Sequence, residues 1–168
     1  MKKQVFGAVS ALAFAASVLP MAIPSLVPVA QAQAGFVPNA PYVASAGIAG
    51  AAGDRHFITV AVAAFPINAV VIECTNLAGV RKATVTNQFG ERVAATTAVS
   101  QSAEGGMALT VTLNKPVKPG NVLRIVMDGV EQNREGGAML YRVSALTDNI
   151  SYPFPVGTAM LLEPVLSD

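Results

Sequence analysis

One stretch of the chain, residues 107–127, reads MALTVTLNKPVKPGNVLRIVM. On both sides of its Pro-Val-Lys-Pro-Gly centre, large apolar residues alternate with small or polar ones. Alternation with a period of two places one set of side chains in a core and the other toward solvent, which predicts strands over 107–114 and 121–128. Proline and glycine between them preset the backbone angles of a turn. The stretch therefore predicts a strand, a corner at 116–120 and a second strand.

The same period extends through the chain from His56 onward, interrupted by glycine-rich or polar turn signals. It predicts further strands over 56–64, 68–75, 82–87, 92–99, 138–146 and 157–163. The expected fold is all-β: an antiparallel immunoglobulin-like β-sandwich of about seven or eight strands over residues 55–168, with a small closed barrel as the alternative. Residues 35–54 are rich in Gly, Ala and Pro and are interpreted as a flexible lead-in that includes at most one edge strand near 41–45.

The first 34 residues have the order of a cleaved secretory signal peptide. Lys2 and Lys3 begin the chain, an uncharged apolar run follows, and small residues end it at Ala30-Gln-Ala-Gln-Ala34. This order predicts cleavage after Ala34, with Ala32 as the second choice. An uncleaved membrane anchor is the alternative, and Pro20, Pro24 and Pro28 argue against it because proline disrupts a spanning helix. The expected location is the periplasm, the cell exterior or the thylakoid lumen, with no transmembrane segment in the mature chain.

Composition excludes two classes of protein. The chain is 52% hydrophobic and 12% charged, with a formal net charge of +1. Without residues 1–34 it has nine Lys/Arg against ten Asp/Glu, a net charge of −1. A basic nucleic-acid binder and an acidic disordered chain are both excluded. The single cysteine, Cys74, shares the apolar face of Val70 and Ile72, which predicts a buried and unreactive thiol; an intermolecular disulfide is the alternative if the strand is exposed.

Part of the chain resembles a known family. The residues concerned are Val111 through the Pro-Val-Lys-Pro-Gly120 corner, Leu123-Arg-Ile-Val, Gly137-Ala-Met-Leu-Tyr-Arg-Val-Ser-Ala145 and Pro155-Val-Gly-Thr-Ala159. Over about 56–165 the chain resembles exported cyanobacterial proteins that carry a domain-of-unknown-function label, although Met160 stands where that family has an arginine. The resemblance implies a β-sandwich in the cell envelope and no catalytic residues.

The corner is also similar to that of copper-resistance periplasmic β-sandwich proteins. Their copper ligands are histidines, one of them at the mature N-terminus. This chain has one histidine, His56, and its mature form would begin at Gly35. The similarity therefore implies the fold and not the copper site.

No arrangement of residues predicts a catalytic or cofactor-binding site. His56 lacks a second ligand or base nearby in the sequence and is interpreted as a polar residue at a strand edge. The polar stretch 128–137 is interpreted as a solvated loop whose oxygens are the candidates for calcium, with Asp128 and Glu131 among them. His56, Asp128 and Glu131 are the candidate metal residues.

The sequence leads to two main functional hypotheses, and a third, a hydrolase, would require a pocket where His56, Glu73 or Asp128 meets a nucleophile. The first is an exported, non-enzymatic interaction or structural module of the cell envelope. Phe57, Val122 and Leu140 lie on the polar faces of their predicted strands, which indicates either two covered faces or a surface for a protein partner or another copy. The alternative is a periplasmic protein that binds copper or calcium. No cofactor and no nucleic-acid partner are expected.

Overall fold

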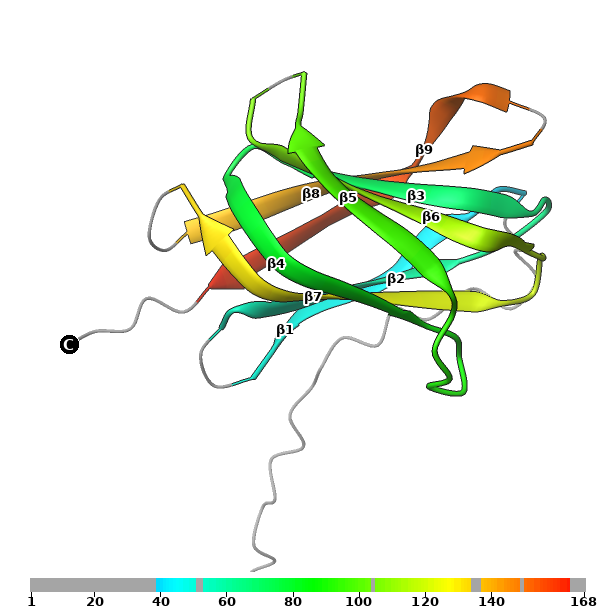
Figure 1. The fold of residues 1–168 in the computed structure, drawn as a ribbon, viewed down its shortest axis with the longest axis horizontal. Helices are drawn as coiled ribbons and strands as arrows, with labels where there is room; N and C mark the ends of the chain where they lie inside the picture. Colours follow the sequence, from blue (N-terminus) through cyan, green and yellow to red (C-terminus); the bar gives the residue numbers. More distant parts are fainter. Residues whose placement is uncertain (1–38, 51–52, 104, 134–136, 149, 164–168) are drawn as a thin grey trace, which may run out of the picture. The chain divides into compact units, whose positions relative to one another are not determined.

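In the computed structural model the described part of the chain forms β-strands joined by turns and loops (Figure 1). The structure describes residues 39–50, 53–103, 105–133, 137–148 and 150–163. Nine strands are present in these ranges: β1 (Tyr42–Ala49), β2 (Arg55–Ala61), β3 (Ile67–Cys74), β4 (Leu77–Thr86), β5 (Ala95–Gln101), β6 (Met107–Val117), β7 (Val122–Gln132), β8 (Gly137–Thr147) and β9 (Ile150–Glu163). The predicted signal peptide, 1–34, lies outside the described residues. No described segment is helical, and none is a helix that could span a membrane.

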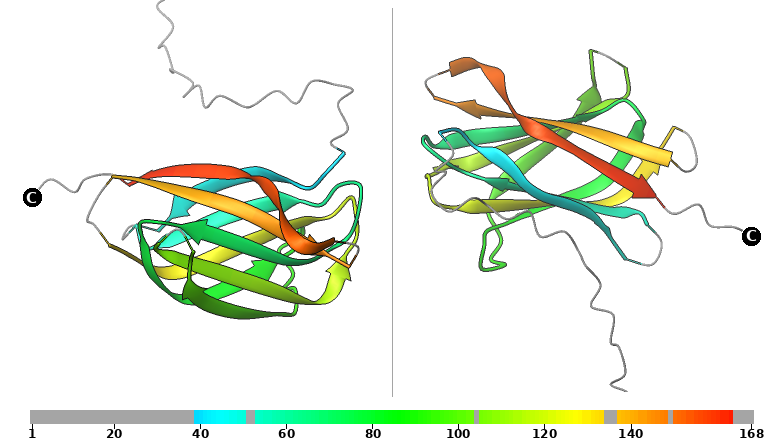
Figure 2. Two further views of the ribbon diagram at one scale, coloured as in Figure 1. Left: turned by 90° about the horizontal axis from the view of Figure 1, so that it is seen from above. Right: turned by 180° about the vertical axis from the view of Figure 1, so that it is seen from behind.

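The strands form two antiparallel sheets that face each other across one apolar core (Figure 2). One sheet has the order β1-β2-β7-β4 and the other the order β5-β6-β3-β8-β9. The division into four and five strands is that of the nine-stranded, variable-type immunoglobulin sandwich. The connections are different here, because β4 pairs with β7 at an edge of the first sheet and β6 lies between β5 and β3 in the second. The predicted sandwich is confirmed, with nine strands where seven or eight are expected, and the barrel alternative is wrong.

The core follows the alternation seen in the sequence. Alternate residues of each central strand are buried, and the others face outward. The largest completely buried apolar side chains include Ile58 on β2, Leu109 on β6, Ile125 and Met127 on β7, and Tyr141 on β8. Each predicted inward-facing set therefore contributes to the core, and both sheets supply it.

The predicted corner connects the two sheets. Strand β6 continues through Pro116 to Val117, and β7 begins at Val122 in the opposite sheet. Gly120 has φ of +85°, a conformation that glycine adopts without a steric penalty. Its N–H donates to the Val62 carbonyl at 2.8 Å, and the Val62 N–H donates to the Asn121 carbonyl at 2.9 Å. These two bonds fix the corner to the end of β2.

The edge strand expected near 41–45 is present as β1, but it runs over Tyr42–Ala49 and pairs with β2, so the interpretation as a flexible lead-in is wrong for residues 46–49. The small residues have a packing role. A Cβ atom at Gly47 would lie 2.8 Å from the Phe57 ring, so the missing side chain lets that ring cover β1. The sandwich therefore begins before the expected boundary at residue 55.

The interpretation of 128–137 as a loop is also wrong for its first five residues, because β7 continues to Gln132. Gly129 has φ of +63°, and the next residue, Val130, donates its N–H to the Asp54 carbonyl at 2.8 Å. Val130 is buried, Asp128 is partly buried and Glu131 is exposed. Residues 134–136 lie outside the described residues.

Candidate functional site

His56 lies in the core and not at a strand edge, so that expectation is wrong. Its exposed fraction is 0%. The Nδ1 atom is 2.6 Å from the Tyr141 hydroxyl oxygen, and Nε2 is 3.0 Å from the Gly53 carbonyl oxygen. Because a carbonyl only accepts, Nε2 carries a hydrogen; in the neutral imidazole Nδ1 then accepts from the Tyr141 O–H, whose oxygen also lies 3.6 Å from the Met139 sulfur. Both ring nitrogens are engaged, which leaves neither for a metal ion.

The alternation along β2 indicates that His56 is buried. His56 lies two and four residues before Ile58 and Val60, the inward-facing residues of β2, and therefore shares their face of the strand. The Tyr141 ring, on the facing sheet, meets the imidazole edge-on with the ring centroids 5.9 Å apart. The pair therefore joins the two sheets through a polar contact inside the core.

Asp128 does not belong to a set of calcium ligands in the described residues. Its carboxylate forms an ion pair with the Arg55 guanidinium on the neighbouring strand β2. Calcium takes six to eight oxygen ligands, and here a cation takes that place. Glu131 is exposed farther along β7 and faces Gly79 of β4. Within the described ranges, no three His, Cys, Asp or Glu side chains come together as a metal site.

A shallow, open groove of about 620 Å³ runs beside the Arg55–Asp128 pair, lined by Gly50, Asp54, Arg55, Arg81, Lys82, Asp128 and Gly129. Arg81 lies over Gly129 and places its guanidinium 3.8 Å from the Asp54 carboxylate. Three cations therefore share the groove with two carboxylates that pair with two of them. Exposed pairs of this kind contribute little to stability or binding.

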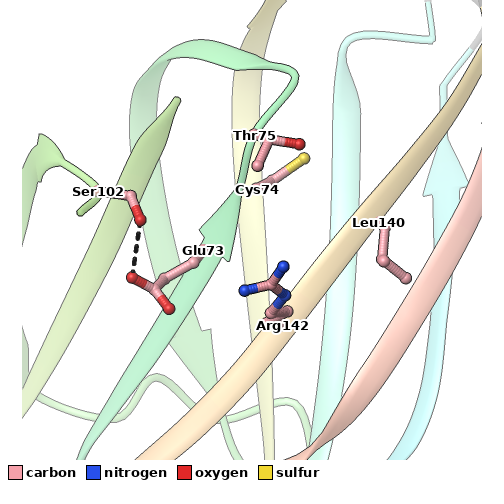
Figure 3. Close-up of a pocket in the computed structure, with 6 residues that line it drawn as sticks. All are labelled: Glu73, Cys74, Thr75, Ser102, Leu140 and Arg142. Atoms are coloured by element: carbon pink, nitrogen blue, oxygen red, sulfur yellow. Dashed lines mark hydrogen bonds between the residues drawn. The ribbon is translucent and has the colours of Figure 1, made fainter. Parts of the chain in front are cut away.

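Cys74 is buried and free of any disulfide, as predicted from its apolar face (Figure 3). Burial raises the pKa of its thiol, and hydrogen bonds with the backbone of Asn76, Leu77 and Leu140 oppose that rise. Beside it, the Ser102 hydroxyl donates to a Glu73 carboxylate oxygen at 2.9 Å. The adjoining cavity has about 30 Å³, room for one or two water molecules and for no organic substrate. Since the one histidine of the chain is bonded elsewhere, no imidazole base reaches this thiol.

The outer face of β8 and β9 carries a row of exposed apolar side chains. Leu140, Met160 and Leu162 have exposed fractions of 47%, 64% and 68%. Leu140 lies directly opposite Met160 in the register of the two strands, and Ala138 lies opposite Leu162. We refer to Ala138, Leu140, Met160 and Leu162 as the ribbon patch. Neighbouring cross-strand side chains touch, so the patch is continuous.

Of the three apolar residues expected on outer faces, two are partly covered by the protein itself and one lies on an exposed surface. The Phe57 ring is covered by the Arg124 guanidinium, whose central carbon lies 4.0 Å from the ring centroid. Val122 is partly buried. Leu140 belongs to the ribbon patch. The sequence pattern identified one member of the patch, while Met160 and Leu162 could have been found by extending the same alternation into β9.

Comparisons with known proteins add little about function. No protein-family model matches the chain, and neither does any curated protein sequence. Among solved structures, the chain is similar to one described as a family 123 glycoside hydrolase from Clostridium perfringens that acts on glycolipid glycans. The identity is 8% and the TM-score 0.29, over 74% of this chain and 22% of the hydrolase. The chain thus spans about a fifth of that protein, at a similarity that supports no functional conclusion.

Proposed function

We propose that the protein is an exported, non-enzymatic β-sandwich that acts as an interaction module of the cell envelope, and that the ribbon patch is its contact surface. The observation that carries the proposal is the patch itself. Single exposed apolar residues are ordinary on protein surfaces, whereas a contiguous group in register on two strands is typical of an interaction site.

The engagement of the reactive side chains supports a non-enzymatic role. His56 is occupied by two hydrogen bonds within the core, Cys74 is buried beside a cavity that holds only water-sized molecules, and Asp128 is paired with Arg55. Nucleophilic catalysis requires a nucleophile, an activating base and room for a substrate within one site. The described residues do not combine these three.

The order of charges, apolar residues and small residues in 1–34 supports export. If the segment is a signal peptide, the exported protein begins at Gly35, or at Gln33 if Ala32 is the cleavage site. Mass spectrometry of the intact protein recovered from expressing cells measures this directly. Recovery of the chain with Met1 or Lys2 still at its N-terminus would contradict export with cleavage.

The interaction role is tested by affinity capture from the native cell envelope. We compare the natural protein with a Leu140→Ser/Met160→Ser/Leu162→Ser variant, and with Phe89→Ser as the matched control. Phe89 is a large exposed apolar residue on the loop between β4 and β5, outside the patch. The proposal expects a partner that is lost with the triple variant and retained with the control. Equal capture by all three proteins, each with an unchanged melting temperature, would refute it.

A further inference from the structure

Strand β5 is an edge strand with one free side. It pairs with β6 along its whole length, without a shift in register, and no other strand of the described residues pairs with its opposite side (Figure 1). Its sequence is ATTAVSQ, and every residue after Ala95 is exposed. It contains no charge, no proline and no bulge.

The hydrogen bonds at both ends of β5 identify the backbone groups on the free side. The Asn114 N–H donates to the Ala94 carbonyl at 3.0 Å, and the Ser102 N–H donates to the Gly106 carbonyl at 3.1 Å. In an antiparallel pair, residues that bond to the neighbouring strand alternate with residues that point away from it. Even-numbered residues of β5 therefore bond to β6. The backbone N–H and C=O groups of Ala95, Thr97, Val99 and Gln101 point toward the free side.

The other edges of the two sheets are protected. Strands β1 and β9 lie against each other, so close that a Cβ atom at Gly157 would be 3.2 Å from a Val43 methyl carbon (Figure 2). Strand β4 carries Arg81 and Lys82, and its Val85 carbonyl already accepts a bond of 2.9 Å from the Val93 N–H. Natural sheets use such coverage and charge to prevent edge-to-edge association. Of the edges in the described residues, β5 alone has neither.

We propose that two copies of the protein associate by antiparallel pairing of β5 with β5 across a two-fold axis. Centred on Ala98, this pairing places Thr97 opposite Val99 of the second copy and Ala95 opposite Gln101. The free N–H and C=O groups of these four residues then form hydrogen bonds with the same four residues of the second copy. The two halves of the interface are identical, as a two-fold interface requires.

The side chains of β5 are compatible with pairing to β5 of a second copy. At the axis, Ala98 meets Ala98 in a non-hydrogen-bonded pair, whose Cα atoms approach to about 4.5 Å. A methyl group is accommodated there without a clash. Because β5 is uncharged, the two copies bring no like charges together. The association joins the five-stranded sheets of both copies into one continuous sheet.

The proposed dimer is independent of the ribbon patch. Strands β5 and β9 form opposite edges of the five-stranded sheet. Substitutions in the patch should therefore leave dimerisation unchanged, and substitutions in β5 should leave the proposed envelope interaction unchanged. Failure of one proposal does not entail failure of the other.

The test is sedimentation velocity over a range of protein concentrations. The protein is expressed from its full sequence and purified with whatever N-terminus the cells leave on it. The natural protein is expected to show a monomer–dimer equilibrium. Ala98→Lys places two ammonium groups at the axis and is expected to weaken dimerisation at least about tenfold. Thr112→Lys, which adds the same charge to the exposed outer face of the adjacent strand β6, is the matched control and should still dimerise.

Charge complementation distinguishes a specific β5 contact from a general loss of solubility. Mixing Ala98→Lys with Ala98→Glu is expected to restore the dimer as a mixed pair. Amide hydrogen exchange should show that Ala95, Thr97, Val99 and Gln101 become protected as concentration rises. A natural protein that stays monomeric would overturn the inference. So would a dimer that survives Ala98→Lys, or one that the triple ribbon-patch variant abolishes.

Discussion

Replacing Tyr141 with phenylalanine tests the buried contact between the two sheets. The substitution keeps the ring, which is completely buried, and removes only the hydroxyl that donates to His56. The loss of packing is therefore small. The main effect is that the imidazole Nδ1 loses this donor where water cannot replace it. Leaving a buried acceptor without its partner costs about 1–3 kcal/mol.

Urea denaturation measures this loss as a fall in the midpoint with an unchanged slope. Tyr152→Phe is the matched control, since Tyr152 is largely exposed on β9 and its substitution should change the free energy of unfolding by less than about 0.5 kcal/mol. The same Tyr141→Phe substitution in a His56→Leu background should cost less, because no imidazole remains to lose its donor.

Two results would refute the reasoning. One is a Tyr141→Phe protein within about 0.5 kcal/mol of the natural protein, which would mean that the hydroxyl contributes nothing net. The other is an equal loss in both backgrounds, which would mean that the Tyr141 hydroxyl acts independently of His56. The cycle separates the contact from the burial of either side chain.

Three further predictions concern other parts of the fold. Gly106→Ala should destabilise the protein by more than Gly120→Ala: both glycines have positive φ, but a Cβ atom at Gly106 would lie 2.4 Å from the Cys74 carbonyl oxygen and one at Gly120 meets nothing within 4 Å. Equal losses in urea denaturation would contradict the clash. Cys74 should react with iodoacetamide far more slowly in native than in urea-unfolded protein, and, because burial raises the thiol pKa above its ordinary 9.0, the free energy of unfolding should fall as pH rises past that value; rapid native labelling would show an accessible thiol. Metal analysis of the purified protein should find neither copper nor calcium in stoichiometric amount, since His56 and Asp128 are bonded to protein partners, and retention of either metal would contradict this.

The β-sandwich could be predicted because large apolar residues alternate regularly on the central strands. On β2, β6, β7 and β8 the pattern was strong enough to identify both the strand and its buried face. Strand β1 was underestimated because its Gly and Ala residues carry no alternation. Its stability comes from pairing with β2 and from the Phe57 ring, which are contacts distant in the sequence.

The candidate site could be predicted only in part, for a different reason. Asp128 and Glu131 look like loop residues because they are charged and lie close to Gly129, yet pairing with β4 continues β7 through both of them. His56 looks like a surface residue because imidazole is polar. Only its position two residues from the buried Ile58, on the same face of the strand, indicates burial. The partner that satisfies it, Tyr141, lies 85 residues away in the sequence. Local patterns cannot identify such partners.

The contact between β1 and β9 has a consequence for how the protein is made. Among the described strands, β1 is the first and β9 the last in the sequence. The strand that leaves the ribosome or the translocon first is therefore covered only after the last one has been released. Until β9 arrives, the backbone groups along the outer side of β1 have no protection. Folding that depends on such distant pairing is slow, and the waiting edge is exposed to association with other chains. We therefore expect truncation before β9 to yield insoluble protein, and the vulnerable period in the protein's life to be the interval before its last strand is released.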